Sequence, residues 1–366
     1  MDFACFNVPI NPVSFGQVST LLLRTLYEGS LKGDSSLPKE IGIFPIGDVN
    51  LSTQKKDDLF QLWLNERAVK AIENHSRENP CFKLWHLFGS LESFSREQTL
   101  LSFYELDSPT KAEINIVRNN KTLFTSQYTC DVFESSEAKC SYVPLAFDSF
   151  NFKRIEKKYF SDDRITFTLV GKLEKRKRHE KILKAWTKKF GDNKKYFLNC
   201  AIYNHFIRPE ENNHFIHKAL DGKSYFNVNF VNYMAENETY NDFLNSADIN
   251  IAMSGGEGWG LPEFHSVAMG KHAVVMNAHG YKGWANKDNS ILVDPSGKIE
   301  SNDNMFFQKG RAYNQGQFFD FDEDDFISSC EEAIKRVKAN PLNSEGLKLQ
   351  EEFSKEKLTQ NILKHI

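Results

Sequence analysis

The chain alternates short, strongly apolar runs with longer stretches in which apolar residues recur every three or four positions. Apolar runs of about four to eight residues predict buried strands, and the periodic stretches predict amphipathic helices. The predicted helices include Val18–Tyr27, His179–Phe190, Asn241–Ala247 and Pro262–Met269. This alternation is typical of β-α-β units built around parallel sheets.

The predicted strands form two consecutive groups of about six, separated by the polar segment Asn151–Arg164. The pattern therefore predicts an α/β protein of two doubly wound, Rossmann-like domains, over residues 1–155 and 156–344. A single (β/α)8 barrel shares the alternation, but two separate groups disfavour it. A last helix over 345–366 lies far beyond the final strand, so we expect it to cross back to the first domain.

Composition and charge exclude several classes of protein. The 366 residues contain 46 Lys and Arg against 49 Asp and Glu, a net charge of −3, so there is no overall basic field for nucleic acid or anionic lipid. The six cysteines are scattered without a C-x-x-C pair, which predicts neither a disulfide frame nor a metal site. No basic and apolar leader and no spanning apolar run is present, so we expect a cytoplasmic protein.

Several familiar catalytic motifs are incomplete. His217 stands where a P-loop ending at Gly222-Lys223-Ser224 needs its first glycine, and Leu183 stands where the zinc-peptidase motif needs a second histidine. The glycines after Met253 do not fit the dinucleotide-binding pattern, and no G-x-S-x-G occurs. These absences disfavour nucleotide hydrolases, zinc peptidases, dinucleotide reductases and serine hydrolases.

The segment Met253–Gly270 (MSGGEGWGLPEFHSVAMG) follows a predicted strand directly. Its glycines let the backbone approach a ligand, and Pro262 suits the first turn of a helix whose free N–H groups face oxygen atoms. Glu257 adds a carboxylate to the loop, which suits sugar hydroxyls better than phosphate. A tight turn with a solvated glutamate is the structural alternative.

A second segment, VGKLEKRKRHEKILKAWTKK, also runs from a strand into a helix. Between Lys172 and Lys189 it contains nine Lys and Arg against two Glu. Cations at a strand end beside a helix N-terminus can bind a diphosphate. The helical half of this run is typical of a solvated face, whereas Lys172 follows the strand end at Gly171 directly.

Together these segments resemble the GT-B glycosyltransferases, specifically the retaining glycosyltransferase family 4 type, or glycosyl transferases group 1. Ser254–Gly270 is similar to the family's S-x-x-E-G-F-G-L-P-x-x-E-A-M-A-x-G, and Val170–Trp186 to its V-G-R-L-x-x-x-K-G-x-x-x-L-I-x-A. FTSQYTCDVF with YVPLAFDSF resembles the pair of motifs that closes the first domain, and Asn11–Leu26 resembles the amino-terminal glycine loop and helix. In this order the motifs cover most of the chain.

The resemblance implies that the two Rossmann-like domains face a cleft, with a nucleotide-sugar donor in the second domain and an acceptor held mainly by the first. It implies transfer of a hexose with retention, from a UDP-sugar or else a GDP- or ADP-sugar, to a saccharide, lipid or other hydroxyl, without metal or other cofactor. Carried over by position, Lys172, Lys177 and Glu257 are the catalytic residues, the lysines on the diphosphate and Glu257 on sugar hydroxyls. The implied donor-binding positions are Gly16, Gly171, Gly258, Trp259, Gly260, Leu261 and His265.

The sequence departs from the family pattern at three positions. His265 stands where the family has a second glutamate that binds the ribose, and we expect the imidazole to take that role with weaker nucleotide binding. Lys172 replaces an arginine, which exchanges a planar fork for a point charge. Arg178 replaces a glycine after Lys177, which leaves Lys175 as an alternative second lysine.

On the acceptor side, His86, Glu105 and Asp107 follow predicted strands of the first half and are candidates for the cleft. A satisfied core histidine and a helix-capping aspartate are equally compatible with the pattern. Alternatives to the transferase are a non-catalytic GT-B binding or scaffold protein and a nucleic-acid base glucosyltransferase that uses the basic run for phosphates. An epimerase of similar fold has no residue in its favour, and nucleic acid is disfavoured by the net charge.

Overall fold

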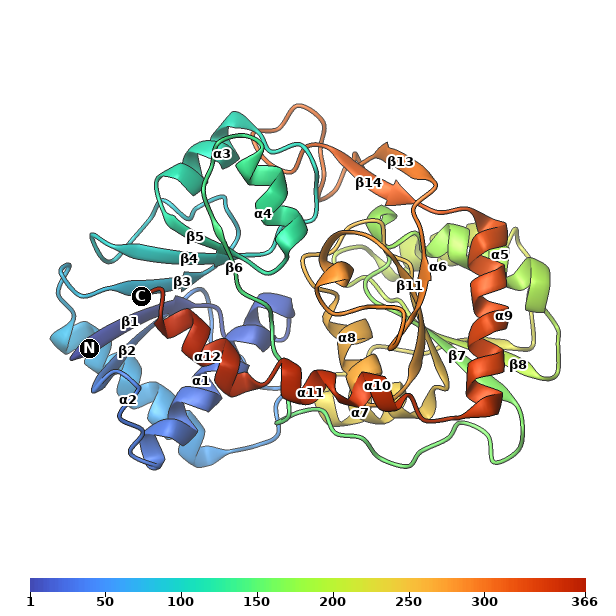
Figure 1. Ribbon diagram of the computed structural model, residues 1–366, viewed down its shortest axis with the longest axis horizontal. Helices are drawn as coiled ribbons and strands as arrows, with labels where there is room; N and C mark the ends of the chain where they lie inside the picture. Colours follow the sequence, from blue (N-terminus) through green and yellow to red (C-terminus); the bar gives the residue numbers. More distant parts are fainter.

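The computed structural model describes residues 1–366. Its first domain is a six-stranded parallel sheet between helices (Figure 1). The strands run in the order β2-β1-β3-β4-β5-β6. They are β1 (Phe3–Val8), β2 (Glu40–Pro45), β3 (Cys81–Leu84), β4 (Gln98–Ser102), β5 (Lys121–Phe124) and β6 (Ser141–Tyr142). The helices are α1 (Ser14–Leu31), α2 (Asp58–Asn74), α3 (Lys111–Arg118) and α4 (Gln127–Glu134).

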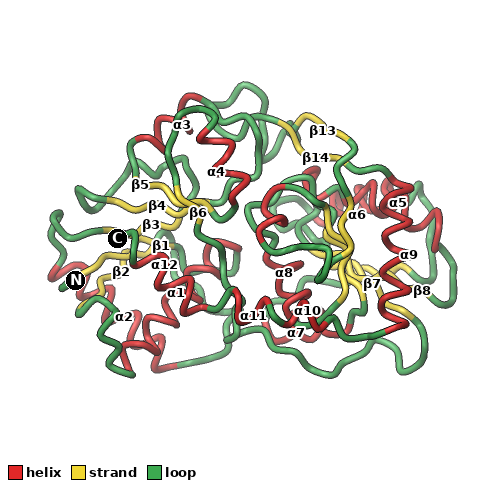
Figure 2. Tube along the Cα trace, in the orientation of Figure 1, coloured by secondary structure: helices red, strands yellow, loops and turns green.

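The second domain repeats this plan, with strand order β12-β11-β10-β7-β8-β9. Its strands are β7 (Ile165–Val170), β8 (Tyr196–Ala201), β9 (Val228–Phe230), β10 (Ile249–Ala252), β11 (His272–Met276) and β12 (Ile291–Val293). Its helices are the 3-10 turn η1 (Lys175–Lys177), α5 (His179–Phe190), α6 (Pro209–Ala219), α7 (Asn237–Ser246), α8 (Leu261–Ala268), the 3-10 turn η2 (His279–Gly283) and α9 (Glu323–Ala339). In Figure 2 the strands lie inside each domain and the helices outside.

The two doubly wound domains predicted from the pattern are confirmed. Helix α5 has the predicted bounds, and α8 lies within one residue of its predicted bounds. The last strand of the first sheet ends at Tyr142 and the second sheet begins at Ile165, so the predicted boundary at 155 lies in the connecting segment. No helix combines the length and the apolar character needed to cross a membrane.

The C-terminal segment returns to the first domain, as expected, but not as one helix over 345–366. It forms α10 (Ser344–Leu347), α11 (Leu349–Glu352) and α12 (Lys355–Leu363), and α12 packs on α1. The helix breaks at Phe353, whose carbonyl accepts a hydrogen bond from the N–H of Phe147 at 2.8 Å. Ser354 then caps α12 by accepting from the N–H of Lys357. Both termini consequently lie on the first domain (Figure 1).

An interdomain arm, residues 297–320, was not predicted. It consists of the antiparallel strands β13 (Gly297–Glu300) and β14 (Gln317–Asp320) and the loop between them, and it lies against α3 and α4 (Figure 1). Phe307 and Phe318 are buried with apolar side chains of the first domain, and their rings are 4.9 Å apart. Asp107 pairs with Lys298 at 2.7 Å and accepts from the N–H of Gln317 at 2.8 Å. The arm therefore fastens the second domain to the first.

We expect Phe307→Ala to loosen the arm, because Phe307 is 6% exposed and truncating a buried Phe costs about 3–5 kcal/mol. Local opening of the loop then becomes more frequent. Limited trypsin digestion at Lys309 and Arg311 measures this opening, and cleavage should accelerate. Met305→Ala, at a side chain that is 38% exposed, is the control. Equal cleavage of the two variants would contradict the anchoring role of Phe307.

Candidate active site

Three loops converge at the carboxyl ends of neighbouring strands of the second sheet. They are the basic loop (residues 171–178) after β7, the glycine-rich loop (residues 254–260) after β10, and η2 after β11; these strands are adjacent in the order β11-β10-β7. Parallel sheets present their ligand sites at this edge. The N–H of Gly280 in η2 donates to the carbonyl of Glu257 at 3.0 Å, so the third loop supports the second.

Glu257 lies at the centre of the three loops and is buried. Its Oε1 atom is 2.7 Å from a guanidinium nitrogen of Arg176 and 2.7 Å from Nζ of Lys177. Lys177 also lies 3.4 Å from Glu263, in the first turn of α8. The predicted residues Lys177 and Glu257 are thus brought together, with two partners, Arg176 and Glu263, that the sequence analysis did not single out.

Lys172 lies at the outer end of the same cluster. Its ammonium is 3.5 Å from Oε2 of Glu174, whose Oε1 is 2.6 Å from Arg176. The ammonium also lies over the rings of Phe306 (4.0 Å) and Phe206 (4.9 Å). Lys172, Arg176 and Lys177 therefore form a row of cations separated by the carboxylates of Glu174 and Glu257.

Gly171 provides the space for the ammonium of Lys177. Its φ is +110°, and a Cβ there would lie 3.1 Å from Nζ of Lys177 and 3.0 Å from its Cε. Lys175, the alternative second lysine, points away and donates to the carbonyl of Asn302 at 2.7 Å on the exposed side. Of the two lysines, Lys177 is the one that lies in the cluster.

The pKa values of the cluster follow from burial opposed by charge. Burial alone would raise the pKa of Glu257, but Arg176 and Lys177 outweigh it and hold that pKa below its ordinary value. Burial likewise opposes the charged forms of Arg176 and Lys177, yet the neighbouring carboxylates raise the pKa of both. For Glu263 and Glu105 burial dominates and raises the pKa. Charged groups at the centre are thus flanked by two carboxyls that take up protons more readily.

The first domain approaches the glycine-rich loop closely. A Cβ on Gly256 would lie 2.7 Å from the carbonyl oxygen of Glu105, and one on Gly258 would lie 2.9 Å from Cβ of Phe103. The hydroxyl of Thr125 donates to the carbonyl of Gly258 at 2.7 Å. The side chain of Glu105 interacts electrostatically with Arg176, Glu257 and Lys172, which places this acceptor candidate opposite the cation row.

Four other predicted donor residues have structural partners. Gly260 has φ +83° at the N-cap of α8, where a Cβ would meet the ring of Tyr281. The ring of Trp259 is 2% exposed and packs edge-on against Phe353. Leu261 begins α8, and the open face of Gly16 in α1 is filled by Asn11. Their ligand contacts stay predictions, and the ring of Trp259 is directed into the core.

His265 is buried against the segment that joins the domains. Its Nε2 accepts from the N–H of Asp148 at 3.2 Å, its Nδ1–H donates to the carbonyl of Leu261 at 2.6 Å, and Phe152 stacks on the ring at 4.3 Å. Burial lowers the pKa of His265 to about 4, so the ring is neutral. Both nitrogens are engaged by the protein, contrary to the free ring that the ribose role requires. That role stays a prediction, and it requires the Asp148 bond to break.

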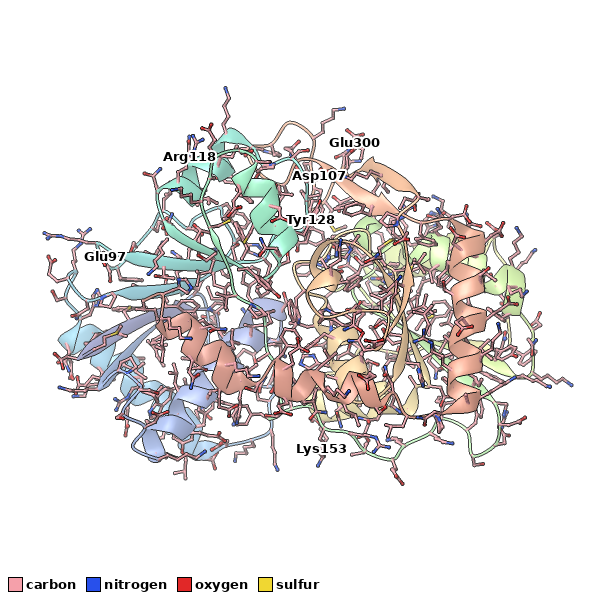
Figure 3. All side chains as sticks on the ribbon, viewed as in Figure 1. Glu97, Asp107, Arg118, Tyr128, Lys153 and Glu300 are labelled. Carbon is pink, nitrogen blue, oxygen red and sulfur yellow. The ribbon has the colours of Figure 1, made fainter.

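The other two acceptor candidates differ in surroundings. His86 lies between the rings of Phe15 (4.4 Å) and Phe88 (4.9 Å), and burial together with the charge of Lys172 lowers its pKa to about 4. It therefore stands near the cation row. Asp107, at the seam between the domains in Figure 3, is occupied by the arm through Lys298 and Gln317. Its role in this structure is to hold the arm.

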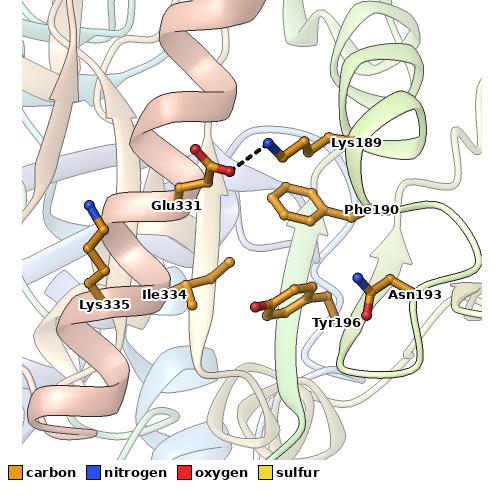
Figure 4. A pocket seen from close by; sticks show the side chains of 7 residues that line it. All are labelled: Lys189, Phe190, Asn193, Tyr196, Glu331, Ile334 and Lys335. Atoms are coloured by element: carbon orange, nitrogen blue, oxygen red, sulfur yellow. Dashed lines mark ion pairs between the residues drawn. The ribbon is translucent and has the colours of Figure 1, made fainter.

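Most of the basic run is paired with acids from other segments. Arg178 and Lys181 pair with Asp320 at 2.8 and 3.0 Å. Lys189 pairs with Glu331 at 2.6 Å beside a cavity of about 390 Å³ between α5, β8 and α9, on the outer side of the second domain (Figure 4). The run therefore does not form a continuous free basic surface, which weakens the nucleic-acid alternative. No group of three His, Cys, Asp or Glu side chains that could hold a metal is present.

A comparison with protein families matches the part of the chain that holds these loops. Residues 151–304 match the model of glycosyl transferases group 1. The chain carries a group 1 glycosyl transferase domain. The match includes the basic loop and the glycine-rich loop, so both motifs belong to a domain of the type that they resemble. A sequence comparison with curated proteins finds no match.

Solved structures resemble the whole chain. Sucrose-phosphate synthase from Thermosynechococcus elongatus has a TM-score of 0.64 at 13% identity, over 99% of this chain and 97% of that chain. HepE from Anabaena in complex with UDP-glucose has 0.61 at 12% identity, and the lipopolysaccharide outer core galactosyltransferase WaaB in its apo form has 0.60 at 12%, each over 100% of this chain and 99% of that chain. At these identities the likeness establishes the fold, so the group 1 domain is the second half of a GT-B chain.

Arg178, where the group 1 motif has glycine, adopts a left-handed conformation with φ +57°. This region disfavours residues with a Cβ by about 1–2 kcal/mol. Both Arg178→Gly and Arg178→Ala lose the ion pair with Asp320, so their comparison isolates the backbone. We expect the glycine variant to be the more stable by about 1 kcal/mol in urea unfolding. An alanine variant of equal or greater stability would show that the conformation is unstrained.

We expect His265→Gln to reduce the loss of stability on acidification. The pKa of His265 is about 4 in the folded protein and about 6.5, the ordinary value, in the unfolded chain. The folded state therefore binds fewer protons, so the free energy of unfolding falls as the pH drops below about 6.5. From pH 7 to pH 5 this amounts to about 2 kcal/mol. Urea unfolding at both pH values, compared with His214→Gln on the exposed face of α6, measures the difference. An unchanged pH dependence would mean that the ring is not buried as described.

Proposed function

We propose that this chain is a retaining hexosyltransferase that moves a sugar from a nucleoside-diphosphate sugar to a hydroxyl acceptor without a metal ion. The observation that carries the proposal is the buried carboxylate of Glu257, held between Arg176 and Lys177 at the strand ends that face the first domain. The Anabaena structure in complex with UDP-glucose supports UDP as the nucleotide, with GDP and ADP as alternatives.

In this proposal the second domain holds the donor. Lys172 and Lys177 bind the diphosphate, and Glu257 accepts hydrogen bonds from sugar hydroxyls. The bond between C1 and the diphosphate oxygen breaks while the acceptor oxygen bonds to C1 on the same face, and the acceptor proton passes to the departing phosphate. Fixed cations stabilise the charge that develops on that phosphate, which is usually the largest catalytic contribution.

The charge balance of the cluster determines how a diphosphate enters. Lys172, Arg176 and Lys177 pair with the carboxyls of Glu174, Glu257 and Glu263, and the carboxyl of Glu105 in the first domain interacts with them electrostatically without forming an ion pair. The cations already have partners, so phosphate oxygens replace carboxylates rather than fill a free positive site. In this proposal the acceptor binds the first domain near His86.

Thermal unfolding with UDP, GDP, ADP and CMP tests the donor site. We expect one nucleotide, UDP first, to stabilise the protein, by about 2.7 kcal/mol when present at a hundred times its dissociation constant. Lys177→Met should abolish the shift, because it removes the ammonium that the diphosphate binds.

Lys189→Met is the matched control, since Lys189 pairs with Glu331 on the outer face and should keep the full shift. The absence of a shift with every nucleotide would reject the transferase and favour a GT-B binding or scaffold protein. A shift that survives in Lys177→Met would place the diphosphate elsewhere. The stereochemistry of sugar released from UDP-glucose, followed by NMR, distinguishes retention from inversion.

A further inference from the structure

Arg176 joins the two ligand loops with both its backbone and its side chain. Its carbonyl accepts from the N–H of Gly255 at 2.8 Å and from the hydroxyl of Ser254 at 3.4 Å. Its guanidinium donates to the carbonyl of Gly256 and contacts the carboxylates of Glu257 (2.7 Å) and Glu174 (2.6 Å). Arg176 thus contacts four consecutive residues of the glycine-rich loop, from Ser254 to Glu257, and no other residue of the basic loop does so. Arg176 therefore sets how the two loops lie against each other.

The two arms of the guanidinium point to different carboxylates. One nitrogen pairs with Oε1 of Glu257 and the other with Oε1 of Glu174. A planar fork can hold two partners in a fixed relation, whereas an ammonium is a single point charge. Lys177 also contacts Oε1 of Glu257, so both ion pairs use the same oxygen and leave Oε2 without an ion pair. The carboxylate, which also has the hydroxyl of Ser254 beside it, is thereby fixed through Oε1, and Oε2 can still accept a hydrogen bond from a ligand hydroxyl.

The cations on either side of Arg176 differ from it in freedom. The side chain of Lys172 is 31% exposed, and its ammonium contacts one carboxylate and two aromatic faces. The side chain of Arg176 is 11% exposed, and its contacts to Glu174, Glu257 and Gly256 engage both terminal nitrogens of the guanidinium. It is therefore suited to orient Glu257 and poorly suited to release it for a phosphate.

We propose that Arg176 is a positioning residue for the donor sugar, which orients the carboxylate of Glu257 toward sugar hydroxyls without itself contacting the diphosphate. The inference rests on the proposed function, since it assigns the sugar half of that site. It separates the basic loop into two tasks: Lys172 and Lys177 act on the diphosphate, and Arg176 acts on the sugar through Glu257.

The test compares UDP with UDP-glucose in calorimetric titrations of the full chain, together with the slow release of glucose to water. In Arg176→Lys we expect the affinity for UDP to stay within about twofold. The affinity for UDP-glucose or the rate of glucose release should fall at least tenfold, because misplacing the carboxylate of Glu257 by an ångström can reduce a rate by about tenfold or more. Arg176→Gln should show the same split, since it also lacks the charged fork. Arg178→Gln, which loses only the pair with Asp320, should behave as the unmodified protein.

Circular dichroism first establishes that each variant is folded, because removing Arg176 leaves Glu174 and Glu257 with fewer cations. Arg176→Lys retains the charge, so the test depends on that variant alone if Arg176→Gln does not fold. Equal losses for UDP and UDP-glucose would overturn the inference and place Arg176 on the diphosphate. Unchanged values for both would overturn it as well. An unmodified protein that binds neither ligand would instead reject the proposed function.

Discussion

The buried contact of Glu257 with Arg176 and Lys177 is the constraint on which the rest of the site depends. Taking these charges out of water is unfavourable, and buried ion pairs are often no more stable than apolar residues in their place. Removing one partner, by contrast, strands the others in a region of low polarity. The fold meets this constraint with close backbone approach: Gly171 makes room for Lys177, and η2 donates to the carbonyl of Glu257. The ion pairs themselves therefore contribute little to stability, which agrees with the ligand-binding role that we propose for Glu257 and Lys177.

The same cluster couples the two domains. Glu105 belongs to the first domain yet faces Arg176 and Lys172 of the second, and the first domain touches the glycine-rich loop through Phe103 and Thr125. The arm adds a second connection through Asp107, and the segment 343–366 adds a third. Relative motion of the domains therefore changes the charge around the site directly.

The sequence was sufficient for features that depend on local pattern. Strand-to-helix periodicity located α5 and α8, and the glycines with Glu257 located the loop at the strand ends. Features decided by distant contacts were not predictable. Within a run of nine basic residues, only the packing against Glu257 turns Arg176 inward. The ring of His265 is held by Asp148, 117 residues away, and the last helix breaks because Phe353 bonds to Phe147. The pairing of β13 with β14 gave no periodic signal, because each strand has only four residues.

The return of the chain to its starting domain sets an order of folding during synthesis. Helix α12, which covers α1 and lies beside Glu28 through Lys355, is made after every residue of the second sheet. The first domain cannot cover that face until α12 has been made, whereas the second domain has all its strands by Val293 and its helix α9 by Ala339. Chains generally fold their N-terminal domain first. Here the sheet of the first domain is complete by Tyr142, but the helix that covers α1 is made only after the strands and α9 of the second domain, so the nascent first domain exposes apolar surface of α1 in the meantime.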